Sequence, residues 1–232
     1  VSAQTNIKWK HNENAFNDFN IQYLIPHFES TRGPKLAVAD VNKDGLDDFF
    51  VCGAKEQSGC LFIQTKDEKF IKVDTAAFAK NINADETDAV FFDANNDGSP
   101  DLYVASGGNE LMNGDTLLKD HLYINDGKGI FKEDMNALPS LLTNKSCVSV
   151  ADVNHDGSND IFIGTLADAK KYGYPQTSYL LLNNGKGKFK IADASIISLQ
   201  NIGLVTSSCF ADVNKDGWMD LRNKEVYFTG NI

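Results

Sequence analysis

The feature that most constrains the fold is a nonapeptide, D-x-N-x-D-G-x-x-D, that occurs four times. The copies begin at Asp40, Asp93, Asp152 and Asp212, so successive starts are 53, 59 and 60 residues apart. A near-constant period of this length indicates one structural unit repeated in series. The sequence therefore predicts a repeat architecture rather than a single irregular fold.

Each unit has the pattern of four short strands. An apolar run enters the nonapeptide, a second leaves it, and an N-x-G-x-G hairpin follows, as at Asn125–Gly129 and Asn183–Gly187. Glycine in that hairpin supplies the positive φ that a tight turn needs. Four-stranded units of this length in series predict an all-β fold, a β-propeller of four-stranded blades. A β-helix would have a much shorter repeat.

The phase of the repeats sets the expected boundaries. We expect residues 1–232 to form a single propeller domain or propeller fragment, with about four blade equivalents. The units are residues 1–35 (a half blade with strands three and four), 36–87, 88–146, 147–205 and 206–232 (a half blade with strands one and two). Two interpretations remain open: the halves close a four-bladed ring, or the chain is an arc of a larger propeller. The polar residues after Leu221 put closure in doubt.

The nonapeptide has the composition of a cation loop. Carboxylates at positions 1, 5 and 9, an amide oxygen at 3 and a backbone carbonyl at 7 make an all-oxygen set, which suits Ca²⁺. Mg²⁺ prefers stricter octahedra, and Zn²⁺ favours His or Cys. An EF-hand is excluded because the loops end at position 9 between strands. The predicted ligands are Asp40, Asn42, Asp44, Leu46, Asp48, Asp93, Asn95, Asp97, Ser99, Asp101, Asp152, Asn154, Asp156, Ser158, Asp160, Asp212, Asn214, Asp216, Trp218 and Asp220.

The charge balance agrees with cation binding. The chain has a net charge of -10, which disfavours nucleic acid as a partner. Up to four Ca²⁺ ions, one in each loop, would bring that charge to about -2. The alternative is that Asp, Asn and Gly only form good turns, without a metal. No apolar run approaches the length of a membrane span.

These residues resemble the FG-GAP/VCBS repeat, the calcium-loop blade also found in integrin α-subunit heads. The segments Asp18–His27, Ser30–Pro34 and Leu36–Asp40 are similar to bacterial VCBS-repeat proteins with ASPIC/UnbV relatives. The resemblance implies a propeller with Ca²⁺ in each loop between strands one and two. Propellers of this type serve adhesion, scaffolding and sugar binding, and in some relatives polysaccharide lyase chemistry.

The function we expect is that of an exported binding, adhesion or scaffold module. Extracellular calcium modules bind with a Kd of about 10⁻⁴–10⁻³ M, too weak for cytosolic calcium, which favours an extracellular, cell-surface or periplasmic bacterial location. We expect a protein or carbohydrate ligand on the long-loop face, and a place within a larger protein. The alternatives are a lyase-like polysaccharide-active enzyme and a structural spacer. No catalytic residue is predicted, because G-x-S-x-G, P-loop and H-E-x-x-H motifs are absent from the sequence.

Tyrosines and cysteines supply the remaining candidates. Tyr172, Tyr174 and Tyr179 either bind a ligand on the long-loop face or pack between blades. Cys52 and Cys60 flank a predicted hairpin, and either a disulfide or two free thiols fits their spacing. Cys147 and Cys209 are predicted to be buried free thiols.

Overall fold

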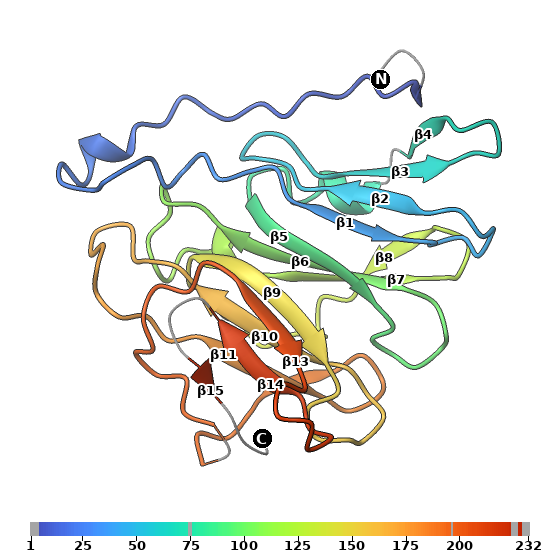
Figure 1. Ribbon diagram of the computed structural model, residues 1–232. Helices are drawn as coiled ribbons and strands as arrows, with labels where there is room; N and C mark the ends of the chain where they lie inside the picture. Colours follow the sequence, from blue (N-terminus) through green and yellow to red (C-terminus); the bar gives the residue numbers. More distant parts are fainter. Residues whose placement is uncertain (1–4, 74–75, 196, 224–226, 229–232) are drawn as a thin grey trace.

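The repeats form four antiparallel sheets that follow one another along the chain. The computed structural model describes residues 5–73, 76–195, 197–223 and 227–228 (Figure 1). Among these residues, no helix has the length and apolar character needed to cross a bilayer. The all-β propeller architecture that the repeats predict is confirmed, since each unit forms its own sheet with its strands in chain order.

The strand bounds follow the predicted units. The first sheet contains β1 (Leu36–Ala39), β2 (Asp48–Val51), β3 (Cys60–Gln64) and β4 (Phe70–Val73); the second contains β5 (Asp85–Phe92), β6 (Asp101–Gly107), β7 (His121–Asn125) and β8 (Phe131–Glu133). The third contains β9 (Lys145–Ala151), β10 (Asp160–Thr165), β11 (Tyr179–Asn183) and β12 (Phe189–Ile191); the fourth contains β13 (Ser208–Ala211), β14 (Asp220–Asn223) and β15 (Tyr227–Phe228). Short helical turns are η1 (Asp18–Asn20), α2 (Ala76–Ala79) and η2 (Thr116–Leu118).

Successive sheets pack face to face through apolar clusters. Phe50 and Leu61 of the first sheet meet Leu102 and Tyr123 of the second in one buried cluster. Equivalent clusters join the second sheet to the third and the third to the fourth. Figure 1 shows the result as a stack, with β5 and β9 lying between β1 and β13. Burial of alternate strand residues on both faces is therefore what holds the blades together.

The N-terminal segment differs from the half blade predicted for residues 1–35. Residues 5–35 contain no strand, only the short turn η1. Ile7 and Trp9 instead pack against Val51, Cys60 and Phe62, on the face of the first sheet that points away from the second. The backbone here bonds to a side chain rather than to a strand: Asn12 N–H donates to Gln57 Oε1 at 2.9 Å. The segment thus covers the first sheet without extending any sheet.

The C-terminal unit has one more strand than its sequence predicts. β15 pairs with β14, placing Leu221 opposite Phe228 and Arg222 opposite Tyr227. Arg222 and Asn223, the first polar residues after Leu221, therefore belong to β14 itself. Both ends of the chain consequently depart from the half-blade pattern that the internal period predicted.

Two observations favour an arc over a closed four-bladed ring. Position 2 of the acidic loop is buried by the next sheet at Val41, Ala94 and Val153, which are 0%, 0% and 1% exposed, whereas Val213 of the fourth loop is 60% exposed. The first sheet also lacks the hairpin residues that would contact a preceding loop. Its turn instead closes on itself, with Thr65 Oγ1 bonded to Asp67 at 2.8 Å.

Candidate functional site

The four acidic loops connect the first and second strands of each sheet and lie along one face of the stack (Figure 1). Their backbone follows the same path in each copy. Position 4 has a positive φ, from 57° at His155 to 63° at Lys215. The glycine at position 6 also has a positive φ, 84° at Gly45. Only a glycine adopts the second conformation without strain, so the loop sequence and the bend are linked.

Side chains at positions 1, 3 and 5 converge in every loop. In the first loop, the Asp44 N–H donates to Asp40 Oδ1 at 3.1 Å and to Asn42 Oδ1 at 3.0 Å. The Gly45 N–H donates to Asp40 Oδ2 at 2.8 Å. The other three loops repeat these distances to within about 0.2 Å. The oxygens of positions 1 and 3 therefore lie side by side around one backbone N–H.

Position 9 has a structural role that its sequence did not suggest. Asp101 is fully buried; its Oδ2 accepts the Ala94 N–H at 3.0 Å and its Oδ1 accepts the Asn125 N–H at 2.8 Å. Asp48 and Asp160 make the equivalent pairs of bonds. Burial raises the pKa of Asp101 and of Asp160 to about 6. This carboxylate holds the loop to the third strand of its own sheet.

The donor chemistry of positions 1, 3 and 5 fits a calcium ion. In the part of the chain that the structure describes, no three Asp, Glu, His or Cys side chains are grouped to hold a metal. Each loop instead brings together two carboxylates and one asparagine oxygen. Hard oxygen donors on a flexible loop are the set that Ca²⁺ accepts. The twenty predicted ligand residues stay a prediction, with position 9 as its least direct member.

The two N-x-G-x-G hairpins fasten the second and third sheets to the preceding acidic loops. Asn125 Nδ2 donates to Val41 O at 2.8 Å, across the interface, and to Pro100 O at 3.0 Å. Asn183 makes the matching bonds to Ala94 O and Asn159 O, at 2.8 and 3.1 Å. A Cβ on Gly129 (φ 77°) would lie 3.5 Å from Val41. The hairpin motif is thus an inter-sheet contact, which the sequence showed only as a turn.

We expect Asn125→Ala to destabilise the protein by about 2–3 kcal/mol. The change leaves Val41 O and Pro100 O without this donor and the Gly127 and Gly129 N–H groups without this acceptor. Urea unfolding in EDTA measures the effect. The matched control is Gln64→Ala, at the equivalent end of β3, where no preceding acidic loop is contacted. Equal losses from the two variants would contradict the inter-sheet role.

The three predicted ligand-binding tyrosines lie in different surroundings. Tyr174 is 65% exposed on the long-loop face. The Tyr172 N–H donates to Gln22 Oε1 at 3.0 Å, which ties this loop to the N-terminal segment. Partial burial and the nearby Glu29 carboxylate raise the pKa of Tyr172. Tyr179 packs against the cluster between the second and third sheets, so of the two roles considered for it, this position favours packing.

The cysteines are all free thiols. The disulfide between Cys52 and Cys60 is not formed, because Val51 is the residue opposite Cys60. Cys52 therefore points into the cluster between the first two sheets, and Cys60 points to the opposite face. Cys147 is buried as predicted, but Cys209 is exposed, because among the residues that the structure describes no further sheet covers this face of the fourth sheet.

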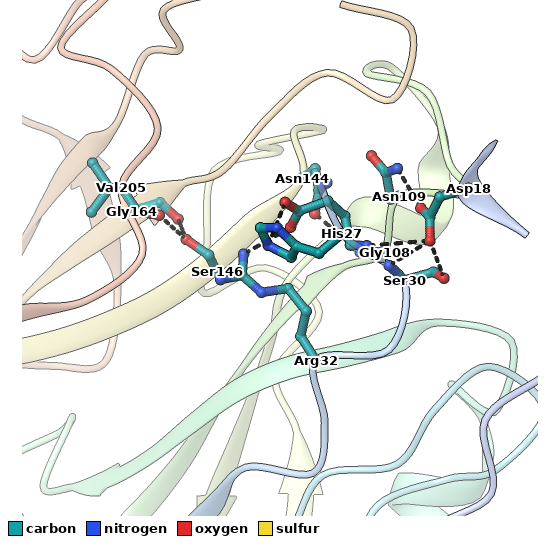
Figure 2. Close-up of polar contacts among 11 residues, drawn as sticks. Asp18, His27, Ser30, Arg32, Gly108, Asn109, Asn144, Ser146, Gly164 and Val205 are labelled. Atoms are coloured by element: carbon teal, nitrogen blue, oxygen red, sulfur yellow. Dashed lines mark hydrogen bonds and ion pairs between the residues drawn. The ribbon is translucent and has the colours of Figure 1, made fainter. Parts of the chain in front are cut away.

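A polar cluster on the long-loop face was not predicted. Asp18 Oδ2 accepts the Ser30 hydroxyl at 2.7 Å, and Asp18 Oδ1 accepts Asn109 Nδ2 at 2.5 Å (Figure 2). Next to it, Glu29 pairs with His27 at 3.1 Å and with Arg32 at 3.3 Å. These residues lie outside the repeat, so the periodicity that located the acidic loops carries no signal for them.

Comparison with known proteins identifies the family to which the repeats belong. A family model described as an FG-GAP-like repeat matches residues 40–104 and 93–163, which together span more than half of the chain. No curated protein matches the sequence.

Two solved structures are similar at low identity. An Agrocybe aegerita lectin, described for its specific recognition of non-reducing terminal N-acetylglucosamine, is 18% identical, with a TM-score of 0.44 over 72% of this chain and 38% of the lectin. The V. cholerae biofilm matrix protein Bap1 is 16% identical, with a TM-score of 0.42 over 86% of this chain and 29% of Bap1. The chain thus spans less than two fifths of either protein. The matched residues contain the first three acidic loops, and the chain belongs to the FG-GAP-like repeat family.

Proposed function

We propose that this chain is an exported, calcium-binding β-propeller that acts as a binding, adhesion or scaffold module for a protein or glycan. The observation that carries the proposal is the shared geometry of the four acidic loops. In each of them the oxygens of positions 1 and 3 meet at one backbone N–H, on the same face of the stack.

Calcium would stabilise the fold from that face. Side chains at positions 1, 3 and 5 would hold the ion, and the ion would neutralise carboxylates that otherwise repel one another. At a Ca²⁺ concentration ten times Kd, each site adds about 1.4 kcal/mol by mass action. Four such sites are comparable with the whole net stability of a domain, about 5–15 kcal/mol. Sites of millimolar affinity fill outside the cytosol, which supports an extracellular, cell-surface or periplasmic location.

The opposite face has the properties of a binding surface. Its irregular loops lie on a rigid sheet scaffold, an arrangement that proteins commonly use for recognition. Tyr23, Leu24 and Tyr174 are 81%, 97% and 65% exposed there. A hollow of about 340 Å³ is lined by residues 21–25 and by Tyr172. Exposed aromatic and apolar groups of this kind contact protein surfaces or the apolar faces of sugars.

The two ends of the stack support a place within a larger protein. Leu36 and Val38 of the first sheet are 59% and 60% exposed, and Val213 of the last loop is 60% exposed. The residues equivalent to Val213 in the other three loops are buried between sheets. Further protein packed against these ends would remove the same apolar surface from water.

Thermal unfolding tests the proposal. Relative to EDTA, 2 mM Ca²⁺ is expected to raise Tm by about 10–20 °C, because four sites together add about 5 kcal/mol and each kcal/mol shifts a chain of this size by about 2–4 °C. Mg²⁺ at the same concentration is expected to give a much smaller shift.

Single-loop variants separate ion binding from a general charge effect. Asp44→Asn, at position 5 of the first loop, should lower the calcium-induced shift by about a quarter. Asp47→Asn makes the same charge change at position 8 of the same loop, where no ligand is predicted, and should leave the shift unchanged. Equal behaviour of the two variants, or equal shifts with Ca²⁺ and Mg²⁺, would overturn the assignment.

A further inference from the structure

A polar cavity lies where the inner strands of the sheets begin, on the face opposite the acidic loops. Its volume is about 130 Å³. The lining includes Lys35 just before β1, Thr87 in β5, Asn144 and Ser146 at the start of β9, and Thr206 just before β13. Because β5, β9 and the residues that lead into β1 and β13 contribute to the lining, the cavity lies at the axis around which the sheets are arranged. Nothing in the repeat sequence marks this position.

The N-terminal segment closes one side of this cavity. Glu29 and Arg32 of that segment belong to the lining. The segment is held in place by Asp18, whose Oδ2 accepts the backbone N–H groups of Glu29 and Ser30, each at 3.2 Å (Figure 2). Asn109, after β6, bonds to the other oxygen of Asp18. The wall is therefore a fixed part of the structure, tied to the second sheet.

Three lining side chains have buried polar atoms without a hydrogen-bond partner: Asn144, Thr206 and Glu29, whose Oε2 makes only the ion pair with Arg32. Asn144 is 2% exposed; its Oδ1 accepts the Gly108 N–H at 3.0 Å, while its Nδ2 has no hydrogen-bond partner. The Thr206 hydroxyl is also buried and without a partner. A buried donor left unsatisfied costs about 1–3 kcal/mol. A ligand that offers acceptors to these donors would recover that free energy.

The charges of the lining favour an anionic acceptor. Glu29, 4% exposed, already faces His27 at 3.1 Å and Arg32 at 3.3 Å. Lys145 is directed to Asp120 at 3.1 Å. Of the charged lining residues, Arg32, Lys35 and Lys145 are basic and Glu29 alone is acidic, so the lining has a net positive charge, and Asn144 and Thr206 add neutral donors. Charge-assisted hydrogen bonds to a carboxylate are about twice as strong as neutral ones.

We propose that this axial cavity binds the carboxylate of an acidic sugar residue, which deepens the proposed binding function and rests on it. An engineered cavity of about 150 Å³ admits a benzene ring, so 130 Å³ admits the carboxylate and the adjoining edge of a pyranose. The remaining ring emerges beside Glu29, which is also close to Tyr172. An aromatic side chain at that rim can stack on the apolar face of the sugar.

Calorimetric titration of the chain in 2 mM Ca²⁺ tests the proposal, with D-glucuronate as the probe. We expect glucuronate to bind at least about tenfold more tightly than D-glucose, which lacks the carboxylate, or acetate, which lacks the ring. Binding of acetate or glucose as tight as that of glucuronate would overturn the assignment to a sugar acid, as would no binding of glucuronate.

Three variants locate the site. Asn144→Asp keeps an acceptor for the Gly108 N–H but replaces the free donor with a negative charge, and should weaken binding at least about tenfold. Lys35→Gln, at an exposed side chain, should weaken it about three- to tenfold. Lys190→Gln makes the same charge change on β12, away from the cavity, and should have no effect. Unchanged binding in the first two variants would overturn the location.

Two further comparisons distinguish loss of binding from loss of folding, and failure of this inference from failure of the calcium proposal. Where Asn144→Asp lowers Tm strongly, Thr206→Val removes the second free donor at nearly constant volume and should also weaken binding. A calcium-dependent rise in Tm without glucuronate binding would overturn this inference and leave the calcium role in place. Glucuronate binding without a calcium-dependent rise in Tm would overturn the calcium role and leave this inference in place.

Discussion

Replacing Asp101 with alanine is expected to lower the free energy of unfolding by about 2–4 kcal/mol, even in EDTA. The Asp101 carboxylate accepts the Ala94 and Asn125 N–H groups, at 3.0 and 2.8 Å, in a fully buried position. Alanine leaves both backbone donors unsatisfied, at about 1–3 kcal/mol each. Relief of the buried negative charge offsets part of that loss, since burial raises the pKa of Asp101 to about 6.

The matched control is Asp97→Ala, at exposed position 5 of the same loop. Its carboxylate accepts the Ser99 N–H near the surface, where water replaces the bond, so its cost in EDTA should stay below about 1 kcal/mol. In calcium the order of the two variants' additional losses should reverse, because position 5 is a more direct member of the predicted ligand set than position 9. Urea unfolding with and without calcium measures both. Equal losses in EDTA would contradict the role assigned to position 9.

The stability that Asp101 contributes in the absence of calcium changes with pH in a definite direction. The folded pKa of Asp101, about 6, lies above the ordinary value of 3.8, so the folded state holds the proton more tightly. Calcium-free stability contributed by this group therefore increases as pH falls from above 6 towards 4, and is lost as pH rises through 6. Asp101→Ala should show a shallower rise over that window than the parent chain.

The periodic part of the site could be predicted from the sequence because its contacts are local. Each acidic loop closes on itself within nine residues, and its ninth residue bonds to the third strand of the same sheet. The four sheets are predictable for the same reason. The direction of individual side chains could not be predicted in this way, because a shift of one residue in strand pairing moves a side chain to the other face. Val51, and not Cys52, lies opposite Cys60, so Cys52 and Cys60 point to opposite faces of the first sheet.

The axial cavity could not be predicted in this way. Glu29, Lys35, Asn144 and Thr206 meet only after all four sheets have packed and the N-terminal segment has crossed them. None of these residues belongs to the acidic nonapeptide or to the N-x-G-x-G hairpin, the two motifs whose repetition the sequence shows. The N-terminal segment itself gains its position from Asp18 and Asn109, 91 residues apart, a contact for which a single sequence offers no pattern.

A buried ion pair between the second and third sheets provides the largest expected effect. Lys145 is 0% exposed; its Nζ lies 3.1 Å from Asp120 Oδ1 and donates to Leu141 O at 2.8 Å and to Leu118 O. Burial lowers the pKa of Lys145, and the Asp120 charge opposes that shift. Lys145→Ala leaves a buried carboxylate and two carbonyls without this partner, and should cost about 3–5 kcal/mol.

A double-mutant cycle separates the pair from the volume that Lys145 fills. Lys145→Met keeps the apolar stem. Asp120 accepts the Tyr103 hydroxyl on Oδ2 at 2.7 Å and the Ser106 N–H on Oδ1 at 2.9 Å. Asp120→Asn keeps an oxygen for the Ser106 N–H, and its amide N–H can donate to the Tyr103 hydroxyl oxygen instead. Each single change strands one charge, whereas the double change strands none. We therefore expect the double variant to be more stable than the sum of the single losses by at least about 1 kcal/mol, measured by urea unfolding in EDTA. Strictly additive losses would show that Lys145 stabilises the fold only through packing and its two bonds to backbone carbonyls. The ion pair with Asp120 would then contribute nothing to holding β9 in place.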